Sequence, residues 1–282
     1  MCIRDRVNEQ AGVSDKAYVI VGGSSGLGLS AARALVNHGA RVAVCGRSEG
    51  RLAQALEMLG ENAVGKKVDA TAAGAVDEFL EFACGEIGDL EGLYHVAGGS
   101  GRSAGDGPLH ELSDEGWDYT IQQNLTSLMM SNRAAVRRFR MQGSGGVILN
   151  MGSVLGFLPS PEYFSSHAYA AAKAGVEGFS KSLASYYAKE GVRVNVITPA
   201  LVETSMSERA RANDEIMEYV SRKQPLDGGR IGVPGDLDGA ALLLLGEGGR
   251  FVTGQVLRVD GGSVSYTHLR AHETVLDLVC RL

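Results

Sequence analysis

The sequence predicts an α/β protein in which a doubly wound parallel sheet of about seven strands carries helices on both faces. Short β-branched segments alternate with longer Ala- and Leu-rich segments of helical spacing, the pattern of repeated strand–helix–strand units. The clearest strands, 17–21 and 41–45, are apolar at consecutive positions, so helices are expected to cover both of their faces. Right-handed crossovers then wind the sheet in two directions from its centre.

This alternation continues along the chain without a linker or an internal repeat. The expected strands are 17–21, 41–45, 63–68, 92–96, 146–151, 192–198 and 255–259. The expected helices are 27–37, 51–59, 75–84, 117–142, 169–189 and 237–245. The length of 282 residues would permit two domains, but open α/β sheets reach about 250 residues as one unit. We therefore expect a single domain over residues 7–264.

The two ends of the chain differ from the rest. Residues 1–6 and 265–282 resemble segments that arise when adapter DNA is translated together with a gene fragment. We therefore expect both to be non-native and exclude them from the fold. The alternative for the second segment is a C-terminal helix, because Val275, Leu276, Val279 and Leu282 recur at helical spacing.

Composition narrows the classes of partner. Lys and Arg number 27 against 33 Asp and Glu, a net charge of −6, and no basic stripe is interleaved with aromatics, so no nucleic acid partner is expected. The longest apolar runs, such as 240–245, are far shorter than the roughly 20 residues that cross a bilayer, so no membrane partner is expected. The first residues lack a secretory pattern, which predicts a cytoplasmic location. Four cysteines without metal-ligand spacing are expected to be free thiols, with no metal site: Cys2, Cys45, Cys84 and Cys280.

A glycine-rich turn follows the first strand, in a chain whose 39 glycines are roughly twice the usual share. Glycines let the backbone turn sharply and approach a pyrophosphate, while the following helix N-terminus offers unpaired N–H groups and partial positive charge. A tight turn with close helix packing is the alternative, but the flanking strand and helix supply the context that a Rossmann-type dinucleotide site requires. The expected cofactor contacts are Gly22, Ser24, Ser25, Gly26, Leu27 and Gly28.

A tyrosine and a lysine four residues apart, Tyr169 and Lys173, share one face of an expected helix. Reduction of a ketone leaves an alkoxide that must be protonated as it forms, so an acid is needed at that oxygen. Tyrosine has an unperturbed pKa of about 10, and a neighbouring ammonium lowers it. Tyr169 is therefore the expected acid of a carbonyl reductase, with Lys173 as the neighbouring ammonium.

The GxxxGxG turn and the YxxxK pair together resemble the short-chain dehydrogenase/reductase family, over about residues 15–262. The family's usual forms are TGxxxGxG, where this chain has Val21, and Asn-Asn-Ala-Gly after the fourth strand, where it has His95-Val96-Ala97-Gly98. The resemblance implies NAD(P)-dependent interconversion of a ketone and a secondary alcohol by hydride transfer. It also implies that Tyr169 protonates the oxygen while Lys173 lowers the pKa of the tyrosine and holds the ribose.

Two further catalytic residues are implied by the same resemblance. Ser153 would orient the carbonyl, with a turn serine as the alternative. Asn124 would interrupt a long helix and hold a water linked to the lysine, with an asparagine on a helix surface as the alternative. The expected catalytic set is Asn124, Ser153, Tyr169 and Lys173.

The resemblance also implies the rest of the cofactor site. Tyr169 and Lys173 are expected to contact the cofactor together with Arg47, Asp69, Ala70, Ala97, Gly98, Pro199, Val202 and Thr204. Gly46 stands where NAD users of the family usually carry Asp, and Arg47 suits a 2′-phosphate, so NADP is expected rather than NAD. Against this, Glu49 argues for NAD, and Arg47 could simply be exposed at a helix start. Asp69 could equally be the N-cap of the helix that follows it.

Rival functions remain open. One is a non-catalytic dinucleotide-binding regulatory or sensor protein of the same fold. An enoyl reductase would place its tyrosine and lysine seven apart, but Tyr163 is followed at that interval by Ala170. We expect a small-molecule substrate, held beneath a lid over residues 205–227 and beside the extra loop 159–162. The family resemblance further implies a homodimer or homotetramer packed through the helices that begin near Trp117 and Tyr169.

Overall fold

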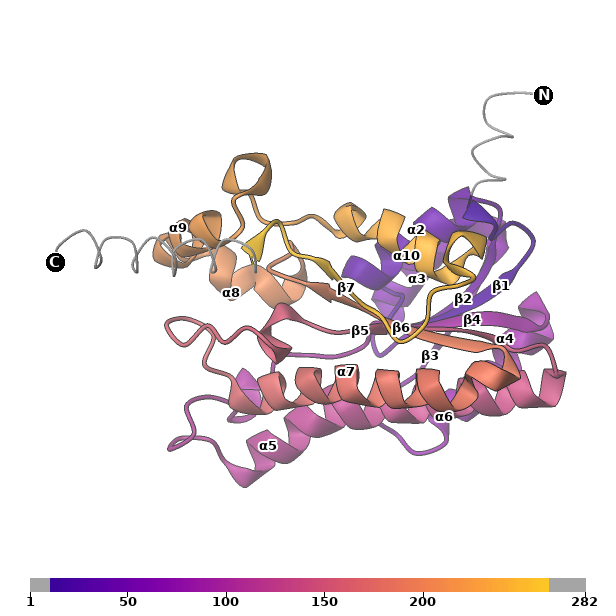
Figure 1. Cartoon of the computed structure of the whole chain (residues 1–282), viewed down its shortest axis with the longest axis horizontal. Helices are drawn as coiled ribbons and strands as arrows, with labels where there is room; N and C mark the ends of the chain where they lie inside the picture. The colour runs from indigo at the N-terminus through magenta and orange to yellow at the C-terminus, as the bar shows by residue number, and fades with distance from the viewer. Residues whose placement is uncertain (1–10, 264–282) are drawn as a thin grey trace, which may run out of the picture.

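Seven parallel strands form one sheet in the order β3-β2-β1-β4-β5-β6-β7 in the computed structural model, which describes residues 11–263 (Figure 1). The strands are β1 Ala17–Val21, β2 Arg41–Gly46, β3 Ala63–Lys67, β4 Leu90–His95, β5 Gly146–Met151, β6 Val192–Pro199 and β7 Val256–Val259. The expected doubly wound α/β fold is therefore confirmed. The segments 1–6 and 265–282 lie outside the described residues.

Helices cover both faces of this sheet. They are α2 Gly26–Asn37, α3 Glu49–Leu59, α4 Ala75–Ile87, α5 Asp114–Ile121, α6 Ser127–Gln142, α7 His167–Tyr187, α8 Glu208–Arg211, α9 Asp214–Lys223 and α10 Asp238–Leu245. One apolar cluster joins α4, α6 and α7 to alternate residues of β1, such as Val19, and the other joins α2, α3 and α10 to Tyr18 and Ile20 (Figure 1). Both faces of β1 are thus buried, as its continuous apolar sequence predicts.

The long helix expected over 117–142 is divided in the structure. It begins earlier, with α5, because the Ser113 side chain accepts a hydrogen bond from Gly116 N and so caps the first turn. A π-helical turn, Gln122–Thr126, then separates α5 from α6. Asn124 lies in this turn and is fully buried, so the alternative of a helix-surface asparagine is wrong.

The direction of winding reverses between β1 and β4, which is where an open α/β sheet forms a crevice at the carboxyl ends of its strands. The loops that follow those ends, together with α8 and α9, lie at the left of Figure 1. Among residues 11–263 no helix is long and apolar enough to cross a membrane, and no group of His, Cys, Asp or Glu could hold a metal ion.

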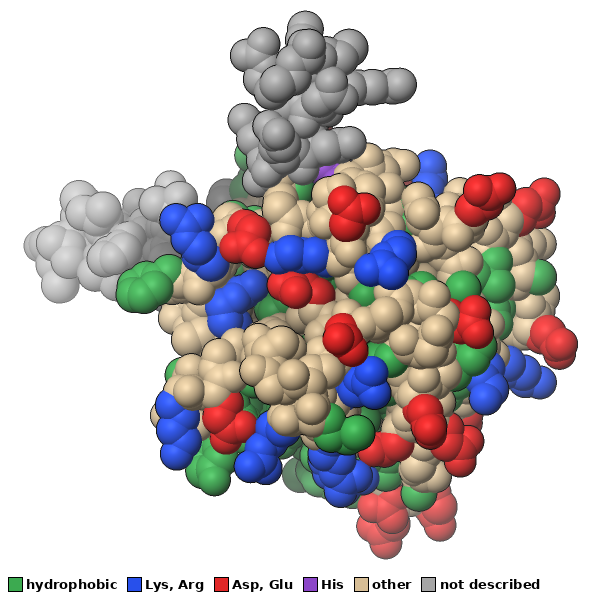
Figure 2. Space-filling model, turned by 90° about the vertical axis from the view of Figure 1, so that its right-hand side faces the viewer, with side chains coloured by type: hydrophobic (Ala, Val, Ile, Leu, Met, Phe, Trp, Pro, Cys, Tyr) green, Lys and Arg blue, Asp and Glu red, His purple; other side chains and the backbone are tan. Residues whose placement is uncertain are grey.

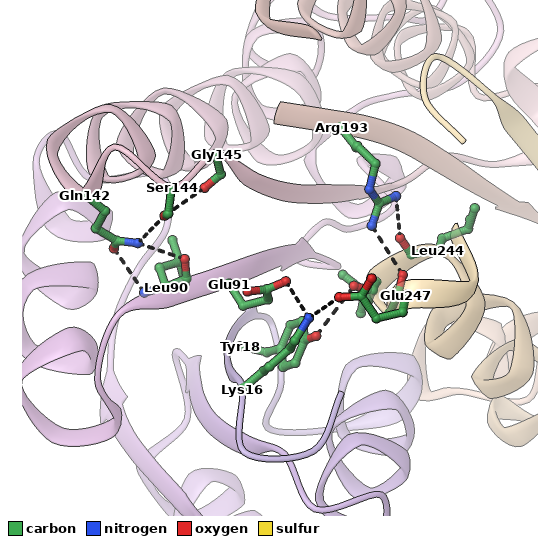
Figure 3. A network of polar contacts seen from close by, with 12 residues as sticks. Lys16, Tyr18, Leu90, Glu91, Gln142, Ser144, Gly145, Arg193, Leu244 and Glu247 are labelled. Atoms are coloured by element: carbon green, nitrogen blue, oxygen red, sulfur yellow. Dashed lines mark hydrogen bonds and ion pairs between the residues drawn. The ribbon is translucent and has the colours of Figure 1, made fainter. Parts of the chain in front are cut away.

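The opposite end of the sheet carries acidic and basic side chains close together on its surface (Figure 2). A polar network fastens the strands there (Figure 3). Lys16 Nζ donates to Glu91 at 3.0 Å and also pairs with Glu247. Arg193 Nη1 donates to the carbonyl oxygen of Leu244 at 2.9 Å. These contacts join β1, β4, β6 and the end of α10. Because they lie far from the crevice, we expect them to stabilise the fold and to take no part in binding or catalysis.

Candidate active site

A cavity of about 740 Å³ opens at the carboxyl ends of the strands. Every catalytic and cofactor residue expected from the sequence lines it except Gly28. The lining set is Gly22, Ser24, Ser25, Gly26, Leu27, Arg47, Asp69, Ala70, Ala97, Gly98, Asn124, Ser153, Tyr169, Lys173, Pro199, Val202 and Thr204. The fold thus brings together residues that are more than 180 positions apart in the chain.

The glycine-rich turn between β1 and α2 forms the floor of one part of this cavity. Gly22 has φ +90°, and a Cβ on it would lie 2.6 Å from Ala97 N. Gly26 has φ +53°, a conformation that side chains disfavour. A Cβ on Gly28 would collide with the carbonyl oxygen of Gly22, so Gly28 allows α2 to pack on the turn. A backbone this open at the N-terminus of a helix fits the pyrophosphate of a dinucleotide.

Asn124 and Lys173 converge beneath Gly98. Asn124 Nδ2 donates to Gly99 O at 2.8 Å, and Gly99 N donates to Asn124 Oδ1 at 3.1 Å. Lys173 is 3% exposed, and its Nζ donates to Met151 O at 2.9 Å. A Cβ on Gly98 would lie 2.7 Å from Asn124 Oδ1 and 3.7 Å from Lys173 Nζ, so glycine keeps this approach open.

The ionisation of Tyr169 departs from the expectation. Burial raises the pKa of Tyr169, and only the Ser153 side chain acts to lower it. The expected lowering of this pKa by Lys173 is therefore not found. Lys173 Nζ is directed to Met151 O and lies 5.6 Å from the centroid of the tyrosine ring, and burial lowers the pKa of Lys173 to about 8. At neutral pH the phenol is thus protonated, as a proton donor must be, and the ammonium form of Lys173 predominates.

Ser153 serves two purposes at the end of β5. Its Oγ accepts a hydrogen bond from Leu155 N at 3.3 Å and so caps the 3-10 turn Val154–Gly156. The same side chain lines the cavity beside Tyr169. The turn-serine alternative and the substrate-orienting role are therefore compatible in one residue.

Asp106, which sequence reasoning missed, holds the N-terminus of α7. Its two carboxylate oxygens accept hydrogen bonds from Ala168 N and Tyr169 N, both at 3.0 Å, and the residue is 4% exposed. A carboxylate here also complements the positive end of the helix dipole. No local signal could have identified it, because it lies 62 residues before Ala168, whose N–H it accepts.

Spacing alone does not identify the catalytic pair, because α9 contains a second tyrosine and lysine four residues apart, Tyr219 and Lys223. Both of these residues also line the cavity. The Tyr219 hydroxyl lies 2.8 Å from Ser160 Oγ, whereas Tyr169 lies beside Ser153 with a buried lysine behind it. The tertiary surroundings therefore distinguish Tyr169 from Tyr219.

The end of the cavity beside β2 is basic. Arg47 and Arg51 both line it, Arg47 just before the N-cap of α3 and Arg51 in the first turn of that helix, and Arg51 is a residue that sequence reasoning missed. A Cβ on Gly46 would collide with Ser24 Oγ, so an acidic side chain has no room there without movement of Ser24. Glu49 does not line the cavity, and its carboxylate lies 4.0 Å from Lys67 Nζ.

Asp69 stands at the same end of the cavity. Hydrogen bonds from the backbone and side chain of Thr71, together with the nearby charge of Arg47, hold the pKa of Asp69 below its usual value. The helix N-cap alternative for Asp69 is wrong, because α4 begins at Ala75 with Gly74 as its N-cap. Asp69 therefore presents a carboxylate to the cavity.

The segment expected to be a lid lines the opposite end of the cavity. A 3-10 turn, Ser205–Ser207, leads into α8 and α9, and Met206, Arg209 and Tyr219 line the cavity. Leu158, Pro159 and Ser160 of the extra loop line it as well. Both segments therefore contribute to the cavity wall, and a lid over the substrate stays a prediction.

Comparisons with known proteins agree with this geometry. A family model described as enoyl-(acyl carrier protein) reductase matches residues 21–264. The cis-4-hydroxycyclohexanecarboxylate dehydrogenase of Sinomonas cyclohexanicum is 32% identical over 251 residues, which cover 88% of this chain and 96% of that protein. The 3-oxoacyl-(acyl-carrier-protein) reductase of Vibrio harveyi is 34% identical over 247 residues, with the same shares covered.

Among solved structures, a gluconate 5-dehydrogenase from Burkholderia cenocepacia in complex with NADP and tartrate superposes with a TM-score of 0.83. It is 26% identical, and the match covers 92% of this chain and 99% of that one. A short-chain type dehydrogenase/reductase from Mycobacterium ulcerans has a TM-score of 0.82 at 29% identity, over 89% of this chain and 90% of that one.

The activity named in the family model's description differs from that of the two named relatives, and the local geometry bears on the difference. Tyr163, the tyrosine of the enoyl-reductase alternative, does not line the cavity, and its ring packs against Tyr219 with centroids 5.1 Å apart. Residue 170, where that arrangement needs a lysine, is Ala. With the glycine-rich turn, the Tyr169 and Lys173 pair and these relatives taken together, the chain belongs to the short-chain dehydrogenase/reductase family and is an NAD(P)-dependent oxidoreductase acting on a carbonyl or an alcohol.

Proposed function

We propose that this protein interconverts a ketone and a secondary alcohol, with Tyr169 as the proton donor and acceptor and NADP as the cofactor. The observation that carries the proposal is that Tyr169, Ser153, Lys173 and Asn124 line one cavity together with the glycine-rich turn. A non-catalytic sensor would need the turn but not these four residues, and the comparisons give that alternative no support.

In the proposed reaction the nicotinamide ring, when bound, supplies or accepts the hydride at the reacting carbon. Ser153 donates a hydrogen bond to the carbonyl oxygen and holds it beside Tyr169. Tyr169, kept protonated at neutral pH by burial, gives its proton to that oxygen. Lys173 would bind the ribose, while Asn124 maintains the loop at Gly99.

We propose NADP in preference to NAD. Arg47 and Arg51 would hold the 2′-phosphate, and two positively charged guanidiniums favour it over a neutral ribose hydroxyl. The position after β2 that would carry an acidic partner for that hydroxyl is Gly46, and Ser24 occupies the adjoining space. The B. cenocepacia relative was solved with NADP, which agrees with this preference.

The substrate is proposed to be a small molecule enclosed by the lid. We further propose a homodimer or homotetramer that packs through α5, α6 and α7, since Trp117 and Tyr186 are large apolar side chains exposed on α5 and α7. A cytoplasmic location stays a prediction from the sequence.

The proposal is tested with Tyr169→Phe, which removes the transferable proton and keeps the ring. We expect kcat for ketone reduction to fall by about a hundredfold or more, while NADPH binding and the melting temperature stay close to those of the wild type. NADPH oxidation and nucleotide fluorescence measure the two effects. Tyr219→Phe, which removes the same hydroxyl from the second YxxxK pair, is the matched control and should keep most of the turnover. Near-native turnover in Tyr169→Phe would contradict the assignment.

A further inference from the structure

The wall of the cavity has a charge opposite to that of the whole chain. Six cationic side chains and one carboxylate line it, although the chain as a whole has a net charge of −6. The cationic residues are Arg47, Arg51, Arg102, Lys173, Arg209 and Lys223, and the carboxylate is that of Asp69. By contrast, the far end of the molecule shows both signs of charge intermixed (Figure 2). A cavity of one sign concentrates ligands of the other.

The proposed cofactor accounts for only part of this positive charge. Arg47 and Arg51 lie beside β2 and would face the 2′-phosphate, and Lys173 belongs to the proposed catalytic set. Arg102 and Arg209 come from different elements, the loop after β4 and the short helix α8. The cofactor assignment therefore gives no function to Arg102 and Arg209.

Arg102 and Arg209 bind the same backbone atom at the end of the cavity lined by residues 205–207 and 209–210. The Nη2 atom of each donates to the same acceptor, the carbonyl oxygen of Tyr163, at 3.1 Å and 3.2 Å. Arg209 also lies over the ring of Phe164, 6.0 Å from its centroid. Because both Nη2 atoms bind the same oxygen, the two guanidiniums are close enough for one carboxylate to contact both.

No carboxylate within residues 11–263 forms an ion pair with either guanidinium. Asp106 is the acidic group whose charge acts on Arg102, but both of its oxygens accept backbone N–H groups of α7. Burial and the charge of Arg209 lower the pKa of Arg102, so the paired guanidiniums repel each other. An anion placed between them would relieve that repulsion.

This cationic pair lines the same cavity as the reacting residues. Along the chain, Arg102 lies between Gly99, which is hydrogen-bonded to Asn124, and Asp106, which accepts a hydrogen bond from Tyr169 N. Phe164, beneath Arg209, lines the cavity five residues before Tyr169. A small substrate can therefore place its carbonyl at Tyr169 and an anionic group at the guanidiniums.

We propose that the substrate is an oxo acid or hydroxy acid, whose carboxylate binds to Arg102 and Arg209 while its carbonyl or alcohol carbon reacts at Tyr169. The proposal rests on the oxidoreductase function proposed above and specifies its substrate class. Arginine is well suited to binding a carboxylate, because its planar guanidinium can donate two hydrogen bonds to the two carboxylate oxygens. A neutral ketone of the same size would leave the two cations without a counter-ion.

The test compares each of three oxo acids with its own methyl ester, so that charge is the main difference between the members of a pair. The acids are 3-oxobutanoate, 4-oxopentanoate and 5-oxohexanoate, which vary the distance from carbonyl to carboxylate. Reduction is followed with NADPH, and binding to the NADP⁺-loaded protein is measured by calorimetry. We expect at least one acid to exceed its ester by about tenfold or more in kcat/KM and in affinity.

The variants are Arg102→Gln and Arg209→Gln, with Arg33→Gln on the exposed face of α2 as the control that removes the same charge outside the cavity. Each cavity variant should reduce the acid-to-ester ratio of kcat/KM about tenfold, chiefly through KM for the acid, and Arg33→Gln should leave the ratio unchanged. A charge effect of the whole protein would instead appear in all three variants.

The outcomes separate the two proposals. Equal or better turnover of the esters, or an equal loss on acid and ester in the arginine variants, would overturn the inference and leave the oxidoreductase function intact. An equal loss on acid and ester would mean that the two arginines only stabilise the loop at Tyr163. Arginine-dependent binding of an acid without turnover of any compound would support the inference and contradict the proposed function. Absence of both binding and turnover across all three pairs would overturn the inference.

Discussion

Asp106 and Tyr169 are joined through the main chain, because Tyr169 N donates a 3.0 Å hydrogen bond to Asp106 Oδ2. The second carboxylate oxygen accepts Ala168 N, so the first turn of α7 is held by a residue of the loop after β4. We therefore expect Asp106 to act as a positioning residue for Tyr169, through the helix that carries the phenol.

We expect Asp106→Ala to lower kcat about tenfold or more, because displacement of a reacting group by a fraction of an ångström is costly to catalysis. Affinity for NADPH should change little, since the glycine-rich turn is untouched. Asp106→Asn keeps one acceptor and should recover part of kcat. Steady-state kinetics and fluorescence titration measure both effects, with Asp114→Ala, an exposed carboxylate at the start of α5, as the control. A lower melting temperature with unchanged kcat would show that Asp106 is only a stabilising cap.

The cofactor preference is expected to depend on Arg47 and Arg51. Their joint replacement, Arg47→Ala with Arg51→Ala, should raise KM for NADPH by about tenfold to a hundredfold, because two charge-assisted contacts to the 2′-phosphate are lost. KM for NADH should stay within about threefold of the wild type. Glu49→Gln, whose side chain is 85% exposed and lies outside the cavity lining, is the control and should change neither value. Equal KM values for the two nucleotides in the wild type would contradict the NADP proposal.

Acid should destabilise the fold through His95. Burial lowers the pKa of His95 to about 3, and the nearby positive charge of Lys173 acts in the same direction. The unfolded chain takes up a proton near pH 6.5 that the native imidazole does not accept until about pH 3, so stability is lost as the pH falls through this range. His95→Asn removes this dependence, and the loss of unfolding free energy between pH 7 and pH 4 should shrink by up to about 3 kcal/mol.

Urea unfolding at pH 7, 5.5 and 4 measures this difference. His110→Asn, at an exposed histidine, is the control and should follow the wild type at every pH. An unchanged pH dependence in His95→Asn would show that carboxylates alone account for acid unfolding.

Arg193 should affect stability without affecting catalysis. Its guanidinium donates to three carbonyl oxygens, that of Leu244 near the end of α10 and those of Gly246 and Val252 between α10 and β7 (Figure 3 shows the first). Arg193→Met should lower the free energy of unfolding by about 1–3 kcal/mol, because partly buried carbonyls lose their donors. Since this network lies at the amino ends of the strands, kcat and KM should be unchanged. A loss of activity at a temperature where the variant is fully folded would contradict this separation.

The strands and the glycine-rich turn could be predicted because their signals are local. Consecutive apolar residues in 17–21 identify a strand buried on both faces, and Gly22 and Gly26 are required where the backbone adopts positive φ. Apolar periodicity predicts a start at residue 117, later than the observed Asp114, because the helix is begun by a hydrogen bond to the Ser113 side chain and not by apolar residues. Helix boundaries depend on such single contacts more than on periodicity.

The sequence by itself determined the order of strands and helices, the glycine-rich turn, and the presence of tyrosine–lysine pairs whose chemistry suits a carbonyl. Only the tertiary structure decided which of two YxxxK pairs lies beside Ser153, that burial raises rather than lowers the pKa of Tyr169, and that Asp106 holds its helix. Only the tertiary structure, too, brings Arg102 and Arg209 to the same acceptor, Tyr163 O. Periodicity and turn chemistry act over a few residues, whereas burial and the convergence of distant side chains arise only when the sheet brings its carboxyl ends to one edge.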